Sequence, residues 1–224
     1  MKKILIVNKN SFFSKKLIKS KIVKYYFITK KNNLNFKNIK KINPTIIFFP
    51  HWSDKIKKKI YENFTCIGFH STPLPYGRGG SPIQNMVLRN FNKTKICAFR
   101  ISSSLDSGPI YLRENLNLNG DGHEIFHRMY SKIINMINKL VSHLPEPKPQ
   151  KGKIVKFKRL SLKNGEIKNT KKLNEVYNLI RALDMRNEAY QNAYINFKNF
   201  RISFKEAKIK RNFIIAKAKI KTNF

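Results

Sequence analysis

Short apolar runs alternate with longer amphipathic segments along the first hundred residues. The runs are rich in β-branched and aromatic residues, which is typical of buried strands. They cover residues 4–8, 22–28, 45–49, 66–69 and 96–101. Between them, apolar side chains recur at helical spacing in residues 11–20, 54–64 and 82–91. This alternation predicts an α/β fold of the Rossmann-like kind, an open and mostly parallel sheet with helices on both faces.

The second half of the chain has a different pattern. A long amphipathic helix is predicted over residues 123–144, followed by a stretch with three prolines and no apolar residue, 145–153. Another helix is predicted over 169–184, and the last stretch alternates like strands joined by tight turns. We therefore expect three parts, a large domain, a linker and a small α+β subdomain with β-hairpins. Their ranges are 1–144, 145–156 and 157–224.

Open α/β sheets bind ligands beyond the carboxyl ends of their strands. Three segments have that place in the predicted sheet: 50–53, 70–80 and 102–108. The second holds three of the nine glycines of the chain, so a pocket is expected there. The first strand lacks the GxGxxG pattern, and nothing favours a dinucleotide cofactor.

The formal net charge of +35 would suit a nucleic-acid partner. The basic residues are scattered along the chain together with abundant Asn and Ile, a mixture that an AT-rich genome imposes on any protein. Both interpretations stay open, and we favour compositional bias. The same bias makes carboxylates informative, because only Asp54 and Glu62 precede Asp106.

Cys66 and Cys97 each lie in an apolar segment and form no CxxC motif. This favours two buried thiols in a reducing cytoplasm, without a disulfide framework or a metal site. No apolar run approaches the roughly 20 residues that cross a bilayer, and the run Ile4 to Val7 is too short for a signal peptide. We expect a cytoplasmic protein without a membrane partner.

Two sequence blocks resemble the paired signature of the formyltransferases that use N10-formyltetrahydrofolate. They are FHSTPLPYGRGGSPIQN (69–85) and SSSLDSGPIYL (102–112). The resemblance covers roughly residues 1–145, and FFPHWS (48–53) makes it closest to the branch that formylates amino sugars. Residues 177–195 are similar to the segment that follows the catalytic domain in that branch.

The resemblance implies roles for individual residues. Formyl transfer to an amine passes through a tetrahedral oxyanion and needs proton transfers, for which His70 matches the family's catalytic histidine and Asp106 its aspartate. The pterin of the donor is expected against Phe49, Pro50, His51, Trp52, Ser102, Ser103, Ser104 and Leu105. The substrate is expected against Ser71, Thr72, Tyr76, Gly77, Arg78, Gly79, Gly80, Gln84 and Asn85.

One position departs from the family. The Asn that donates to the formyl oxygen two residues before the histidine is replaced by Gly68. Either Gln84, Asn85 or a water takes over this role, or the protein is catalytically impaired, since losing one oxyanion donor costs about 10²–10³-fold in rate. Without the two blocks, His70 would read as a packed side chain and Asp106 as the cap of a turn.

The expected function is formylation of the amine of a nucleotide-linked amino sugar for surface polysaccharide. The expected partners are this small molecule and no specific nucleic acid, with a tail that could mediate a homodimer. One alternative is methionyl-tRNA formyltransferase, which suits the charge but normally carries a full carboxy-terminal β-barrel, for which about seventy residues are few. Another is a non-catalytic nucleic-acid-binding protein on a degenerate formyltransferase fold.

Overall fold

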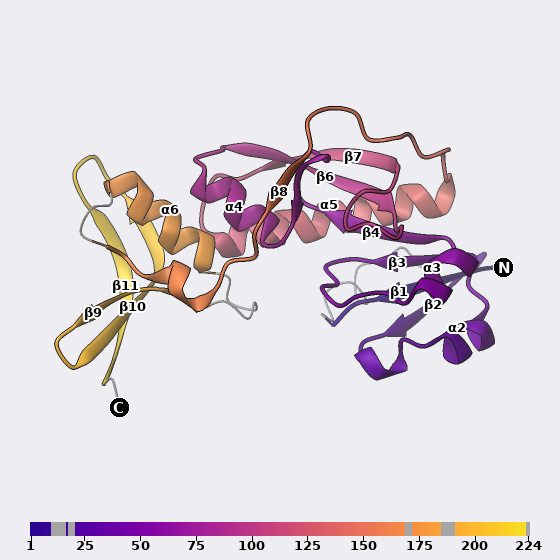
Figure 1. Ribbon diagram of the computed structural model, residues 1–224, viewed down its shortest axis with the longest axis horizontal. Helices are drawn as coiled ribbons and strands as arrows, with labels where there is room; N and C mark the ends of the chain where they lie inside the picture. Colours follow the sequence, from indigo (N-terminus) through magenta and orange to yellow (C-terminus); the bar gives the residue numbers. More distant parts are fainter. Residues whose placement is uncertain (10–16, 18–20, 169–171, 185–190, 223–224) are drawn as a thin grey trace. The chain divides into compact units, whose positions relative to one another are not determined.

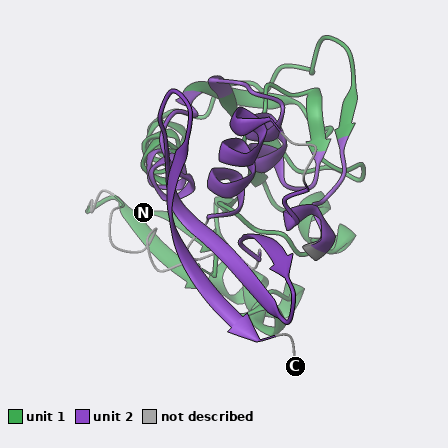
Figure 2. Ribbon diagram, turned by 90° about the vertical axis from the view of Figure 1, so that its left-hand side faces the viewer, with its two compact units in different colours: residues 1–78, 95–115, 129–156 green, residues 79–94, 116–128, 157–224 purple. Residues whose placement is uncertain are grey.

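The computed structural model describes residues 1–9, 17, 21–168, 172–184 and 191–222. Two compact units divide the chain (Figure 2). The first comprises 1–78, 95–115 and 129–156, and the second comprises 79–94, 116–128 and 157–224. The units interleave along the sequence, whereas the domains predicted from the sequence are consecutive, and those boundaries stay a prediction. The helix expected over 11–20 falls, except for one residue, outside the described residues.

A six-stranded sheet in the order β2-β1-β3-β4-β6-β7 lies largely in the first unit (Figure 1). Its strands are β1 (Lys2–Val7), β2 (Val23–Ile28), β3 (Ile46–Phe49), β4 (Cys66–His70), β6 (Lys93–Arg100) and β7 (Ile110–Asn117). The side chains of β3 are all buried, as expected for an inner parallel strand that is covered on both faces. The predicted fold class is therefore confirmed, and each of the five predicted strands is present within a few residues of its expected range.

The sheet departs from the expected direction at one strand. β1 pairs in parallel with β2 and β3, and β3 with β4, but β4 and β6 are antiparallel, with Ile67 opposite Arg100 and His70 opposite Cys97. Alternation of strands and helices does not encode the direction of a single strand. The expectation that segment 102–108 leaves the sheet at the same edge as His70 is wrong, because an antiparallel strand ends at the opposite edge.

The described helices of the first half are short, and two of them were not predicted. They are η1 (Lys31–Asn33), α2 (Phe36–Ile42), α3 (Lys58–Asn63) and α4 (Pro82–Leu88), and the longer α5 (Gly122–Ser142) follows β7. Neither η1 nor α2 was predicted from the sequence, although Asn35 caps α2 by accepting a hydrogen bond from the backbone N–H of Asn38 at 2.9 Å. Ile39 of α2 is fully buried in the same core cluster as Leu5 and Ile47.

The second unit contains a small antiparallel sheet in the order β11-β10-β9. Its elements after residue 157 are η2 (Leu162–Gly165), α6 (Leu173–Leu183), β9 (Ala193–Phe197), β10 (Phe200–Ile209) and β11 (Ile214–Thr222). Leu179 and Leu183 of α6 pack in one core cluster with Ala193 and Ala207 of the sheet. The helix and strand hairpins predicted for this part are thus present.

The proline-rich segment 145–156 is bonded to its surroundings. The backbone of Lys148 exchanges two hydrogen bonds with Ile110, at 2.7 and 2.9 Å. Further on, β8 (Val155–Phe157) forms a two-stranded sheet with β5 (Tyr76–Gly79), the strand inside the glycine-rich block. The segment expected to be a plain linker therefore runs beside that block. Within the described residues, no helix is long and apolar enough to cross a membrane.

Candidate active site

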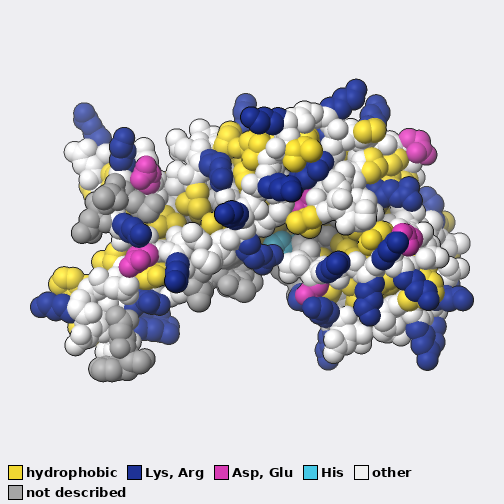
Figure 3. All heavy atoms as spheres, viewed as in Figure 1, with side chains coloured by type: hydrophobic (Ala, Val, Ile, Leu, Met, Phe, Trp, Pro, Cys, Tyr) yellow, Lys and Arg dark blue, Asp and Glu magenta, His cyan; other side chains and the backbone are white. Residues whose placement is uncertain are grey.

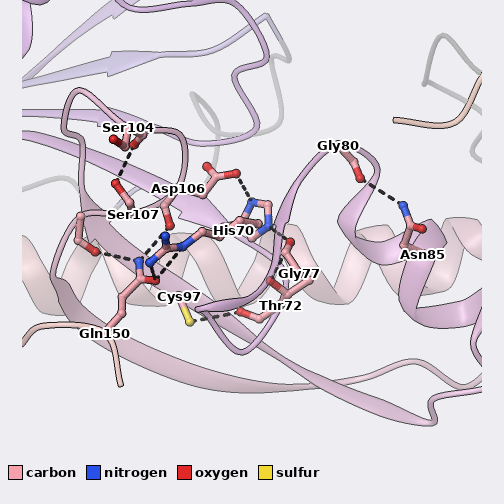
Figure 4. Close-up of polar contacts among 12 residues, drawn as sticks. His70, Thr72, Gly77, Gly80, Asn85, Cys97, Ser104, Asp106, Ser107 and Gln150 are labelled. Atoms are coloured by element: carbon pink, nitrogen blue, oxygen red, sulfur yellow. Dashed lines mark hydrogen bonds and ion pairs between the residues drawn. The ribbon is translucent and has the colours of Figure 1, made fainter. Parts of the chain in front are cut away.

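His70 is the last residue of β4, and only 6% of it is exposed. Its Nε2 atom lies 2.7 Å from the carbonyl oxygen of Gly77, and its Nδ1 atom lies 3.5 Å from Oδ2 of Asp106 (Figure 4). Both neighbours are acceptors, so a neutral imidazole can donate to only one of them, and an imidazolium to both. In this structure both ring nitrogens of His70 therefore face acceptors of the protein itself.

Asp106 reaches His70 because the loop after β6 folds back. The N–H of Arg100 donates to the carbonyl of Pro109 at 2.8 Å, which closes the base of the loop. A Cβ atom on Gly108 would lie 1.7 Å from the carbonyl oxygen of Arg100, so this closure requires glycine. Asp106 itself has φ 51°, a left-handed conformation that Asp and Asn tolerate better than other side chains. The two candidate catalytic side chains are thus brought together by the loop and not by the strand ends.

Two glycines of the glycine-rich block are required by the backbone conformation and packing around them. Gly77 has φ 80°, and its carbonyl accepts from Thr72 Oγ1 at 3.3 Å as well as from His70. A Cβ on Gly79 would lie 2.4 Å from the carbonyl oxygen of Phe157 in β8. A ligand pocket was expected around these glycines, and at Gly79 the backbone that comes close is that of β8.

Arg78 and Gln150 form a contact that the sequence analysis did not anticipate. Oε1 of Gln150 accepts from Nε and Nη2 of Arg78 at 3.1 and 2.7 Å. Its Nε2 donates to the carbonyl oxygens of Asp106 and Gly108 at 2.9 and 2.8 Å (Figure 4). The amide of Gln150 in an otherwise proline- and lysine-rich stretch was the available signal, but its partners are 42–72 residues away in the sequence.

The remaining residues expected at the substrate have different surroundings. Ser71 and Thr72 are buried, and Ser71 Oγ donates to the sulfur of Met129 at 3.0 Å. Gln84 and Asn85 are buried in the second unit, which also holds Gly79 and Gly80, while Tyr76 is half-buried in the first.

Asn85 is a poor replacement for the missing oxyanion donor. Its Nδ2 donates to the carbonyls of Gly80, Ser81 and Lys158 at 3.1, 3.0 and 3.0 Å (Figure 4 shows the first). Two amide hydrogens shared among three carbonyl oxygens are already committed. Asn85 would have to break one of these bonds to serve a substrate oxygen.

The loop after β3 offers two side chains to a ligand. Phe49 and Pro50 are buried, and the Pro50 carbonyl accepts from the side-chain amide of Asn8. His51 is exposed with φ 55°, and its ring meets that of Tyr130 edge-on, with 5.8 Å between centroids. The Nε1 atom of half-buried Trp52 is itself buried and has no hydrogen-bond partner among the described residues.

The second segment expected to bind the folate, residues 102–105, forms hydrogen bonds within its own loop. Ser107 Oγ donates to the carbonyl of Ser104 at 2.8 Å (Figure 4), and it lies 3.2 Å from Ser102 Oγ. Ser103 and Ser104 are exposed, and Leu105 is 73% exposed. An apolar side chain so open to solvent, next to Asp106, is available to pack against a ligand.

Gly68 is fixed by its neighbour on β6. It pairs with Phe99, and a Cβ at position 68 would lie 2.9 Å from Cζ of Phe99 and 3.3 Å from Cγ1 of Ile101. The phenyl ring therefore occupies the space where the family's Asn side chain would begin.

The two thiols are not candidate nucleophiles. Burial raises the pKa of Cys66 to about 12, and burial also raises the pKa of Cys97, partly offset by a hydrogen bond with the backbone of Leu74. Both cysteines are free and buried. Among the described residues, no group of three or more His, Cys, Asp or Glu side chains could hold a metal ion.

Comparison with known proteins relates this chain to enzymes that act on tRNA. Residues 162–221 match the family model described as methionyl-tRNA formyltransferase, C-terminal domain. The methionyl-tRNA formyltransferase of Thermodesulfovibrio yellowstonii is 30% identical over 154 residues, which are 65% of this chain and 50% of that protein. The one from Sulfurihydrogenibium sp. is 26% identical over 189 residues, 80% of this chain and 60% of that protein. The chain thus spans between half and three fifths of the length of these curated relatives.

Comparison with solved structures also relates this chain to formyltransferases. A methionyl-tRNA formyltransferase from Clostridium thermocellum is 38% identical with a TM-score of 0.93, covering 99% of this chain and 100% of that chain. A sugar N-formyltransferase from Shewanella sp. has a TM-score of 0.72 at 16% identity, covering 92% of this chain and 97% of that chain. At that identity the second likeness shows the fold alone.

Two expectations from the sequence are wrong. The amino-sugar and polysaccharide function is overturned by the methionyl-tRNA formyltransferases among its relatives, and with it the expectation of no specific nucleic-acid partner. The argument from a short tail fails because the solved C. thermocellum chain is itself covered to 100% by this chain. The blocks around His70 carry the resemblance to formyltransferases, and they do not identify the acceptor.

Proposed function

This chain belongs to the formyltransferase family, and from that premise we propose that it transfers a formyl group from N10-formyltetrahydrofolate to the amino group of methionyl-tRNA. Members of the family transfer formyl groups and use this folate as the donor, which confirms the donor expected from the sequence. The observation that carries the proposed acceptor is the full-length match, at 38% identity, with the C. thermocellum enzyme.

The geometry of the candidate site suits the chemistry. The amine nitrogen attacks the formyl carbon, an oxyanion forms, and the bond from this carbon to N10 breaks. The amine loses one proton and N10 gains one, so the protein needs a group that accepts and returns a proton. His70 is that group once the amine takes the place of the Gly77 carbonyl at its Nε2 atom: Nε2 accepts the amine proton and passes it to N10, while Nδ1 stays on Asp106, whose carboxylate stabilises the imidazolium.

The residues around the loop after β3 fit a pterin. A flat ring with hydrogen-bonding edges needs aromatic or aliphatic surfaces and a few polar groups. Exposed His51 and Leu105 offer such surfaces, and the buried N–H of Trp52, without a partner among the described residues, offers a donor. These residues would hold the donor, which supplies the formyl group.

A row of basic side chains supports a nucleic-acid acceptor. Ile214 and Ala216 of β11 pack in the core cluster, so Lys217, Lys219 and Lys221 lie on the opposite face of the strand. Cross-strand pairing places Lys205 opposite Lys217 and Arg201 opposite Lys221. We call these five residues the basic sheet face.

The basic sheet face lies in the part of the chain that matches the C-terminal domain model. Figure 3 also shows Lys and Arg side chains over much of the visible surface, with few acidic ones between them. Phosphate groups bind such a surface without sequence readout. The charge that the sequence analysis attributed to compositional bias is therefore available for tRNA.

The test is turnover with the purified chain. Isotopically labelled N10-formyltetrahydrofolate is incubated with methionyl-tRNA, with free methionine, and with an amino-sugar nucleotide as a control acceptor. We expect label in methionyl-tRNA alone. Salt-resistant transfer to the sugar nucleotide, or tight tRNA binding with no transfer to any acceptor, would overturn the proposal. The second result would identify a non-catalytic binding protein.

A further inference from the structure

Gln150 joins three segments that the candidate active site depends on. It lies in the proline-rich segment, and its amide bonds to the Asp106 loop on one side and to β5 on the other. All five residues concerned, Arg78, Asp106, Gly108, Gln150 and His70, belong to the first unit. We propose that Gln150 is a positioning residue that sets the place of the Asp106 carboxylate against His70.

The amide uses both its ends. The two hydrogens of Nε2 go to the carbonyl oxygens of Asp106 and Gly108, while Oε1 receives two N–H groups of the Arg78 guanidinium. A bond to the charged group is stronger than a neutral one. Arg78 therefore fixes the orientation of the amide, and the amide in turn fixes two carbonyls of the loop.

The loop needs such an anchor. Asp106 sits at positive φ on a loop that turns back from an antiparallel strand, and its neighbours Ser104 and Leu105 are exposed. The serine hydrogen bonds described above lie within the loop, so they preserve its shape but do not attach it to the rest of the unit. Gln150 holds the backbone of Asp106 itself.

The segment that carries Gln150 is in turn tied on both sides. Lys148 pairs with Ile110, and the N–H of Val155 donates to the carbonyl of Pro75 at 3.3 Å. The proline-rich segment is thus a strap on the candidate site. Arg78, which was expected at the substrate, binds this segment through Gln150.

The inference rests on the proposed function, because it concerns the geometry of formyl transfer. Misplacing a catalytic group by about 1 Å costs up to roughly 10²-fold in rate. Gln150→Ala is expected to lower kcat by about 10–100-fold while KM for each substrate changes less than about 3-fold. Lys151→Ala, an exposed side chain on the same strap, is the matched control and should keep the wild-type kcat.

Gln150→Glu separates positioning from simple attachment of the strap. A carboxylate keeps, and strengthens, the contact with Arg78 but cannot donate to the two carbonyl oxygens. A merely structural role predicts wild-type kcat with an unchanged or higher melting temperature. Positioning predicts a kcat as low as that of Gln150→Ala despite that melting temperature.

A spectroscopic readout does not depend on the acceptor. In protein labelled with 15N-histidine, the His70 resonances are assigned by their loss in His70→Asn. In both Gln150 variants they should move toward their positions in Asp106→Asn. A wild-type chain that formylates nothing defeats the proposed function but leaves this comparison readable. Wild-type His70 resonances in both variants, or wild-type kcat in Gln150→Glu, would overturn the positioning role.

Discussion

The Nδ1 atom of His70 lies 3.5 Å from Oδ2 of Asp106, although β4 and β6, which lead to these residues, run in opposite directions. The contact therefore depends on how the loop after β6 returns, and this return uses Gly108 and the positive φ of Asp106. The candidate catalytic pair is a property of a loop held in place, which makes its geometry sensitive to substitutions that leave the core intact.

Asp106→Asn should separate chemistry from folding. Asn tolerates positive φ as Asp does but carries no charge to stabilise an imidazolium. We expect kcat to fall about 10²–10⁴-fold with a melting temperature within a few degrees of wild type. Asp106→Ala should lose as much activity and also about 1–3 kcal/mol of stability, because alanine is strained at φ 51°. Equal melting temperatures for the two variants would contradict the backbone argument.

Gly68→Ala tests whether the ring of Phe99 fills the space that a side chain at position 68 would need. The added methyl group would press on a ring 2.9 Å away inside a buried sheet, so we expect a loss of about 1–3 kcal/mol in the free energy of unfolding. Phe99→Leu should relieve the clash, and the double variant should be more stable than the sum of the single losses implies. Urea unfolding of the four proteins measures the coupling, and strict additivity would show that the ring is not in the way.

The sequence predicted the framework of this protein better than the geometry of its site. Strands 45–49 and 66–69 were found because buried parallel strands need continuous apolar runs, and α5 because its periodicity is long. β7 (Ile110–Asn117) was missed, since its mixture of polar and apolar residues, IYLRENLN, resembles a surface loop.

The geometry of the candidate site could not be predicted from the sequence. The motifs marked His70 and Asp106, but strand direction and the return of the loop are tertiary properties that no local pattern carries. Gln150 was missed for the same reason, because all its partners are distant in sequence. The acceptor was misjudged because the motifs describe formyl transfer, which both branches perform.

Trp52, the single tryptophan of the chain, should report binding of the donor. Its buried N–H has no partner among the described residues, so a pterin acceptor placed there gains a hydrogen bond worth about 0.5–1.5 kcal/mol. Titration with a reduced folate should change Trp52 fluorescence, after correction against free tryptophan. Trp52→Phe should weaken binding about 3–10-fold by calorimetry. Binding heat without any fluorescence change would place the pterin elsewhere.

Cys66 should be inert in the folded protein. Burial raises its pKa to about 12, so the folded thiol keeps its proton well above neutral pH. The unfolded thiol ionises near its ordinary value of about 8.5, so stability from this group is fully present below that pH and falls as pH rises toward 12. Iodoacetamide at pH 8 should label Cys66 only as fast as the protein unfolds. The loss of folding stability between about pH 8.5 and 12 should be smaller in Cys66→Ala than in the wild type. Rapid labelling of Cys66 without denaturant would contradict its burial.

The basic sheet face should carry part of the salt dependence of tRNA binding. Each phosphate contact contributes about 0.7–0.9 to the slope of log affinity against log salt. Replacing Lys219 and Lys221 by alanine should weaken tRNA binding and lower this slope by about that amount for each lysine lost. The matched control replaces Lys40 and Lys41 of α2, two exposed lysines of the first unit, which removes the same charge. If net charge alone attracts tRNA, both pairs will reduce the slope equally. A tRNA footprint on the basic sheet face requires a larger change from Lys219 and Lys221, with the melting temperature unchanged in both variants.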